Sequence, residues 1–114
     1  MIPEEFKSKY YNRKGEVIPL NEWAELFEDY KYKIVRQDQI GKFFVSTVWL
    51  GMDHNFFRFM EKEAPIYIFE TMIFADDDYG DIYQVRYSTE EEALAGHLVA
   101  IEEAKSMSNK TEDV

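Results

Sequence analysis

The segment 66–74, IYIFETMIF, constrains the fold more than any other stretch of the chain. Its β-branched and aromatic residues favour a strand, and apolar residues occupy both of its alternating faces. A strand that is apolar on both faces lies inside a sheet, not at its edge. Glu70 interrupts this pattern, and a carboxylate in a central strand is costly unless a partner or water satisfies it. The sequence therefore predicts a central strand with an acid that needs a partner.

Three other runs are rich in strand-forming residues, at 30–38, 42–50 and 82–88. Gly41 marks a turn between the first two runs, and the acidic stretch at 75–81 separates the last two strands. Consecutive strands with short connections favour antiparallel neighbours. We therefore expect a four-stranded antiparallel β-meander.

Helical patterns flank these strands. Residues 22–30 carry apolar side chains at i, i+3, i+4 and i+7, and Asn21 is positioned to cap them. A second pattern begins with a capping box formed by Ser88 and Glu91, and we expect this helix to end near Met107. In the second helix Leu94, Leu98 and Ile101 form the expected apolar stripe, with Ala93, Ala100 and Ala104 beside it.

A chain of 114 residues suits one domain with one core. The predicted class is α+β: a four-stranded antiparallel β-meander with a short N-terminal helix and a longer C-terminal helix packed on the sheet. We assign residues 1–107 to this single domain and 108–114 to a flexible tail.

Pairing of the last two strands gives Glu70 a partner. If Phe74 lies opposite Ile82, then Glu70 faces Arg86, and opposite charges across a strand pair are favourable. Folding the longer connection before the central strand places Ser46 opposite Glu70, or Thr47 after a one-residue slip.

The alternation of side chains then defines two faces of the sheet. We expect the C-terminal helix to cover the aromatic face, which comprises Val45, Thr47, Trp49, Tyr67, Phe69, Thr71, Ile73, Tyr83, Val85 and Tyr87. The opposite face comprises Ser46, Val48, Ile68, Glu70, Met72, Gln84 and Arg86. This second face combines apolar area with a charged centre, which suits a partner or ligand that needs orientation. A half-solvated face with a structural ion pair is the alternative.

Composition narrows the function classes. A net charge of −10 opposes direct binding to nucleic acid, which depends on Lys and Arg, and is compatible with a basic partner or with solubility alone. The chain has no Cys, which excludes disulfides and thiolate chemistry. No apolar run reaches the ~20 residues of a membrane span. The N-terminal sequence does not match a secretory signal. We expect a cytoplasmic protein.

Asp53 and His54 follow the second strand directly and are candidates for chemistry. Adjacent residues of a strand point to opposite sides, so a turn would have to reorient them toward one substrate. With Glu70 and His97 they could form an enzyme site or a metal site. The sequence contains no close ligand spacing of the HExxH kind, and we predict no metal and no cofactor.

Four stretches occur together: YYNRKGEVIPLNEWAELFED, VSTVWLGMDHNF, PIYIFETMIF and YSTEEEALAGH. In this combination the chain resembles an uncharacterised family of small bacteriophage and prophage proteins, over most of residues 10–97. The segment 55–65 and the DDDYGD loop depart from the family pattern. The resemblance implies a phage product that acts in an infected host, and it carries no activity. It favours a joint site of Thr47, Trp49, Asp53, His54, Glu70 and His97.

These observations lead to one functional prediction. We predict a non-enzymatic, phage-encoded binding protein of the host cytoplasm that engages a host protein or sequesters a small molecule, and so counters host defence. A small hydrolase or metal-dependent enzyme that uses Asp53, His54 and Glu70 is the first alternative, and a virion or assembly protein is the second. A homodimer formed through a sheet face or edge also remains open. The candidate binding residues are Thr47, Trp49, Asp53, His54, Glu70, Arg86 and His97.

Overall fold

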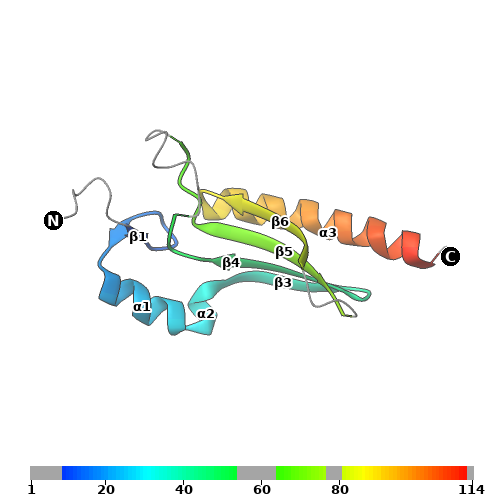
Figure 1. The fold of residues 1–114 in the computed structure, drawn as a ribbon, viewed down its shortest axis with the longest axis horizontal. Helices are drawn as coiled ribbons and strands as arrows, with labels where there is room; N and C mark the ends of the chain where they lie inside the picture. Colours follow the sequence, from blue (N-terminus) through cyan, green and yellow to red (C-terminus); the bar gives the residue numbers. More distant parts are fainter. Residues whose placement is uncertain (1–8, 54–63, 77–80, 113–114) are drawn as a thin grey trace.

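The computed structural model of the protein describes residues 9–53, 64–76 and 81–112. It confirms the predicted α+β class (Figure 1). The elements are β1 (Tyr10–Tyr11), β2 (Val17–Ile18), α1 (Leu20–Glu28), α2 (Tyr30–Lys33), β3 (Ile34–Ile40), β4 (Phe43–Trp49), β5 (Phe69–Ala75), β6 (Asp81–Tyr87) and α3 (Glu90–Glu112). No helix among the described residues has the length and apolar content needed to cross a membrane.

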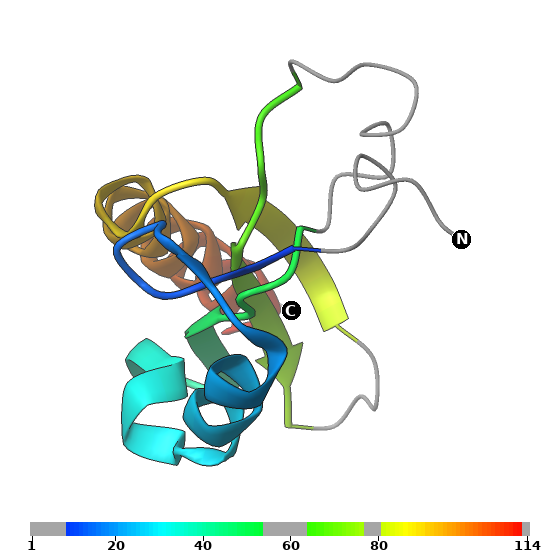
Figure 2. The ribbon, with the colours of Figure 1, turned by 90° about the vertical axis from the view of Figure 1, so that its left-hand side faces the viewer.

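The main sheet has the order β3-β4-β5-β6, and every neighbouring pair is antiparallel, as predicted for a meander. The long helix α3 packs on one face of this sheet and contacts all four strands. Figure 2 views the sheet end-on, with α3 and both short helices on its left. The described residues place no helix on the opposite face, which we call the open face.

Strand register follows the prediction on one side of β5 only. Glu70 lies opposite Arg86, as expected. On the other side, the prediction that Ser46 or Thr47 faces Glu70 is wrong, because Glu70 lies opposite Val48. A long connection does not fix register, whereas the burial of one face does. The error from Ser46 to Val48 is two residues, so the paired residues of β4 and β5 remain on their predicted faces. Ile68, predicted on the face of Glu70, is instead buried in a core cluster with Trp49 and Phe69.

The two outer strand pairs each contain an irregularity. Phe74 lies opposite Asp81, not opposite Ile82 as predicted, because the β5–β6 register shifts after Ile73. The β3–β4 pair shifts between Ile34 and Arg36. Bulges of this kind are common at sheet edges.

The predicted helix over residues 22–30 is two helices. α1 begins at Leu20 after Pro19, so Asn21 lies inside the helix and is not its cap. Asp29 then separates α1 from α2, and its side chain accepts hydrogen bonds from the backbone N–H groups of Lys31 and Tyr32. The strand predicted to begin at residue 30 therefore starts at Ile34.

α3 begins and ends later than expected. Thr89, not Ser88, caps it: the backbone N–H of Glu92 donates to the Thr89 hydroxyl over 3.1 Å. The Thr89 hydroxyl in turn donates to the Glu92 carboxylate, so the N-terminal cap lies one residue beyond the predicted one. The helix continues to Glu112, beyond its predicted end near Met107.

The buried side of α3 also differs from the predicted leucine stripe. Small side chains face the sheet, and Leu94 and Leu98 are 38% and 53% exposed. Short side chains let a helix backbone approach a sheet closely, which the larger leucines would prevent. The fully buried positions of α3 are Ala93, His97, Ala100 and Ala104.

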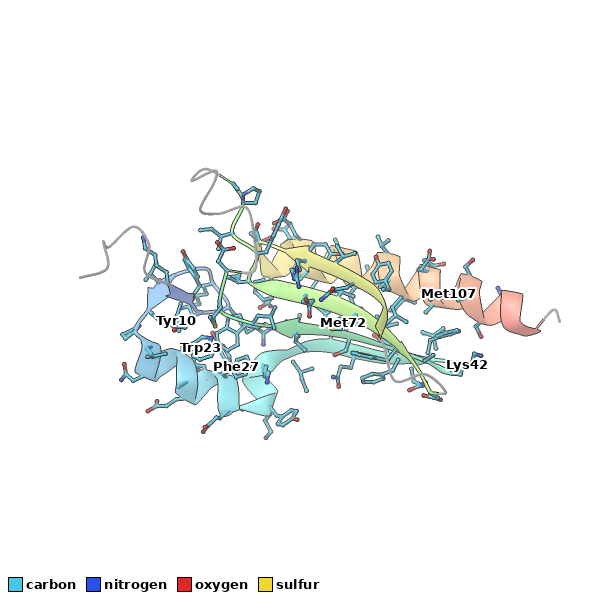
Figure 3. The ribbon with its side chains drawn as sticks, in the orientation of Figure 1. Tyr10, Trp23, Phe27, Lys42, Met72 and Met107 are labelled. Atoms are coloured by element: carbon cyan, nitrogen blue, oxygen red, sulfur yellow. The ribbon has the colours of Figure 1, made fainter. Side chains whose placement is uncertain are left out.

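The core contains two clusters beneath α3. One lies under the C-terminal half of the helix and is built around Phe43, Val45 and Ile73. The other is aromatic and includes Trp49 and Phe69. Figure 3 shows Tyr10, Trp23 and Phe27 gathered at its outer side, where the Trp23 ring lies 5.0 Å from Tyr10 and 4.8 Å from Phe27 between centroids. The segment 10–18, which we call the N-terminal arm, and α1 thus close one end of the sheet.

Gly96 sits where α3 passes over the ring of Tyr87, and a Cβ atom there would lie 2.1 Å from that ring. We expect Gly96→Ala to lower the free energy of unfolding by about 0–2 kcal/mol. Overpacking costs about 1–3 kcal/mol, and the better helix propensity of Ala recovers about 1. Urea unfolding measures this, with the exposed neighbour Ala95→Gly as a control for propensity alone. A stabilised Gly96→Ala variant would show that Tyr87 moves aside freely.

Candidate functional site

The structure divides the seven candidate residues between the two faces of the sheet. Thr47 and His97 meet beneath α3, and Glu70 and Arg86 meet on the open face. Thr47 and Glu70 therefore do not share a site. Trp49 and Asp53 have structural contacts described below, and His54 lies outside the described residues.

A buried polar chain links α3 to three strands. Its members are Asp38, Thr47, Thr71 and His97. The hydroxyls of Thr47 and Thr71 are 2.6 Å apart, and the Thr47 hydroxyl is 2.6 Å from His97 Nδ1. His97 Nε2 lies 2.7 Å from Asp38 Oδ2. Because an ionised carboxylate only accepts, Nε2–H is the donor to Asp38, and in the neutral imidazole Nδ1 then accepts from Thr47.

The sequence of hydroxyl, imidazole and carboxylate is the arrangement by which a base activates a nucleophile. Here Thr47, Thr71 and His97 all have 0% exposed surface. A substrate therefore has no access to the Thr47 hydroxyl, and the second threonine occupies its other side. The arrangement supports a structural role: it satisfies polar groups inside the core and ties α3 to β3, β4 and β5.

Asp38 is the end of this chain that reaches the surface. Its side chain is 30% exposed and also accepts from Arg36 Nε over 2.8 Å. The His97 hydrogen bond, followed by the Arg36 hydrogen bond, lowers the pKa of Asp38 from its ordinary value. Both donors favour the ionised carboxylate.

The lowered pKa makes the stability of the protein depend on pH through Asp38. A carboxylate with a folded-state pKa below its unfolded value stabilises the fold above the unfolded value, near 3.9, and this contribution is lost as pH falls through the folded value. We expect the stability difference between wild type and Asp38→Asn to be greatest above pH ~4 and to shrink below it. Urea midpoints from pH 6 to pH ~2.5 measure this, with the exposed Glu103→Gln as control. A pH-independent difference would contradict it.

The open face has Glu70 near its centre. Among the described residues two donors reach its carboxylate, and both bind Oε2, which accepts from Gln84 Nε2 over 2.7 Å and from Arg86 Nε over 3.0 Å. The side chains of Glu70 and Arg86 are 10% and 25% exposed. The ion pair is thus largely withdrawn from water, and Glu70 has Arg86 as its partner, as predicted.

Apolar and neutral polar side chains surround this pair. Ser46 is nearly buried and accepts a hydrogen bond from Gln37 Nε2 over 3.0 Å. Met72 lies over the middle of the sheet in Figure 3, between Ser46 and Gln84 in the strand register. Partly exposed apolar residues complete the face: Phe44, Val48, Met72 and Phe74.

Trp49 and Asp53 hold the backbone in place. Trp49 is fully buried and donates from Nε1 to the carbonyl oxygen of Tyr11 over 3.0 Å. Asp53 Oδ1 accepts from the backbone N–H of Tyr67 over 3.1 Å. Trp49 is therefore a core residue, and Asp53 joins the two described segments that flank residues 54–63.

Within residues 9–53, 64–76 and 81–112, no three acidic or histidine side chains are close enough to hold a metal ion. The enzyme alternative that uses Asp53 and His54 depends on a residue outside these ranges. It therefore stays a prediction.

Sequence reasoning missed Asp38, Thr71 and Gln84 as site residues. Asp38 is a charged residue on the helix-facing side of β3, and a charge on a buried face signals a partner. Thr71 lies directly opposite Thr47, and Gln84 lies opposite Met72, two residues along the strands from the Glu70–Arg86 pair and on the same face. Polar residues on the predicted inner face were the available signal for Asp38 and Thr71, and a polar residue on the same face as Glu70 was the signal for Gln84.

Comparison of the chain with protein-family models, with curated proteins and with solved structures found no match in any of the three.

Proposed function

We propose that the protein is a phage-encoded, non-enzymatic binding protein that engages a host protein through the open face of its sheet. The observation that carries this proposal is the central ion pair of Glu70 and Arg86 on a face that no described helix covers. On the other face Thr47, Thr71 and His97 are fully buried and Asp38 alone of the polar chain reaches the surface, so the open face is the better candidate for contact with a partner.

The composition of the open face favours a protein partner. Its partly exposed apolar side chains, Phe44, Val48, Met72 and Phe74, supply area that gains free energy when it is buried. The oriented Glu70 and Arg86 side chains supply specificity at its centre. Apolar surroundings with a few fixed polar groups are typical of the buried centre of an interface.

The charge of the chain supports the same reading. A net charge of −10 repels nucleic acid and attracts a partner with a basic surface, which raises the rate of encounter. The phage origin and action in the host cytoplasm rest on the sequence resemblance and on the absence of Cys. Interference with host defence is our hypothesis for why a phage would encode such a protein.

Affinity capture from phage-infected host lysate tests the proposal. Tagged wild type is compared with Met72→Glu, which alters the open face, and with Leu98→Glu, which makes the same charge change on the exposed side of α3. We expect a host protein to copurify with wild type and Leu98→Glu and to be lost from Met72→Glu. Thermal melts show that both variants fold. Equal capture by all three proteins, or no host protein with wild type, counts against the proposal.

A further inference from the structure

We infer that Glu70 Oε1 is a binding point for a cationic donor, the ammonium or guanidinium group of a basic side chain on the partner. This inference rests on the proposed function, because it names the chemistry that the open face recognises. It assigns the two oxygens of one carboxylate to different tasks. Oε2 is held inside the protein, and Oε1 is left for the partner.

The hydrogen bonds of Glu70 carry this assignment. Gln84 Nε2 and Arg86 Nε both donate to Oε2, at 2.7 and 3.0 Å. Within the described part of the chain, no donor reaches Oε1. A carboxylate offers about four acceptor positions, so half of its capacity is unused. The residue is only 8% exposed, and a nearly buried acceptor without a donor costs free energy that a bound donor recovers.

The surroundings of Glu70 strengthen a hydrogen bond to Oε1. Two donors already fix the carboxylate, so little side-chain freedom is lost when a third group binds. Val48 lies directly opposite Glu70, and Met72 follows two residues along the same strand. These apolar neighbours keep the local dielectric low, which favours a charge-assisted hydrogen bond over competing water.

A cation fits this position better than other groups. An ionised carboxylate oxygen only accepts hydrogen bonds, which excludes anions and bare carbonyl groups. The chain carries 23 acidic against 13 basic residues, so its overall field attracts a basic side chain. The same field opposes a second copy of this chain, since each copy has a charge of −10. A basic protein partner is therefore the occupant.

An NMR titration with small probes tests the inference directly. The probes are N-acetyl-argininamide and N-acetyl-lysinamide, with the uncharged N-acetyl-citrullinamide as control, and the readout is the side-chain resonances of Gln84 and Arg86. We expect saturable shifts with a cationic probe only. Equal shifts with the uncharged probe, or no saturable shift with either cationic probe, overturn the inference.

Two variants make the test specific. Glu70→Gln keeps the shape of the side chain and an oxygen that can accept from Gln84 and Arg86, but it replaces Oε1 by an NH2 group. We expect the affinity for the cationic probes to fall about tenfold or more. Glu103→Gln makes the same change in net charge on the exposed side of α3 and should have no effect. Unchanged binding by Glu70→Gln overturns the inference.

Val48→Lys provides a second route if Glu70→Gln does not fold. The lysine places its own ammonium group opposite Glu70, where it takes the position of a bound cation. We therefore expect the cationic probes no longer to bind. Val99→Lys, at a position that is 61% exposed on α3, is the matched control. Retained probe binding by Val48→Lys contradicts the inference.

Capture from lysate separates this inference from the proposed function. A host protein that is lost with Met72→Glu and with Glu70→Gln, but kept with Glu103→Gln, supports both. A host protein that is lost with Met72→Glu and kept with Glu70→Gln leaves the binding face in place and refutes the role of Oε1.

Discussion

Replacing His97 with alanine is expected to lower the free energy of unfolding by about 3–5 kcal/mol, measured by urea denaturation near neutral pH. His97 is fully buried and contacts Thr47 and Asp38 through its two ring nitrogens. Its removal opens a cavity between α3 and the sheet, and large-to-small changes in a core cost about 2–5 kcal/mol. It also removes a hydrogen-bond partner from the buried Thr47 hydroxyl, which adds to the cost.

Two further variants separate these effects. His97→Leu fills most of the cavity but leaves Thr47 without its nitrogen partner, so its loss should be smaller than that of His97→Ala. Adding Thr47→Val and Thr71→Val to His97→Leu removes the hydroxyls as well, and we expect this triple variant to be more stable than His97→Leu alone. Asp38 keeps the hydrogen bond from Arg36 in every variant. A loss below about 0.5 kcal/mol for His97→Ala, the range of surface substitutions, would contradict the structural role of the chain.

The predictable parts of the fold are those determined by local alternation. The central strand, the two faces and the Glu70–Arg86 pair follow from a period of two and a short hairpin connection. The pairing with β4 could not be fixed, because the long connection leaves register open, and the error was two residues. Side chains of a strand alternate with a period of two residues, so this error does not change the face on which the paired residues of β4 and β5 lie.

The packing of α3 was predicted less well because hydrophobicity alone does not show which side of a helix meets a sheet. The leucines at 94 and 98 are the more apolar choice, yet the alanine side of the helix is buried. Close approach of α3 to the sheet favours small residues. His97 can be buried among them because Thr47 and Asp38 form hydrogen bonds with its two ring nitrogens.

Sequence patterns likewise do not show which of the candidate site residues lie together in the fold. The resemblance to phage proteins grouped Thr47, Glu70 and His97, and the structure places the first and third together and the second on the other side of the sheet. Asp38 is 59 residues from His97 along the chain, and only the tertiary fold brings the two together. No local pattern identifies such a pair.

Gly51→Ala is the second substitution with a large expected effect, a loss of about 2–5 kcal/mol in the free energy of unfolding. Gly51 has a φ of +74°, in the left-handed region, where a side chain costs about 1–2 kcal/mol. A Cβ atom at this position would lie 2.5 Å from both the Trp23 and the Trp49 rings. Overpacking of this kind costs about 1–3 kcal/mol more. The carbonyl of Gly51 also accepts from the backbone N–H of Tyr11, so displacement would loosen the N-terminal arm.

Gly15→Ala is the matched control for this prediction. Gly15 has a similar φ of +85°, but no atom lies within 4 Å of the Cβ that would be added. It therefore reports the backbone cost alone, about 1–2 kcal/mol, and the additional loss in Gly51→Ala reports the contact with the two tryptophans. Tryptophan fluorescence during urea unfolding measures both variants, and the native-state emission should change only in Gly51→Ala. Equal losses would mean that the rings of Trp23 and Trp49 do not close over Gly51, and the aromatic end of the core would then be looser than its contacts indicate.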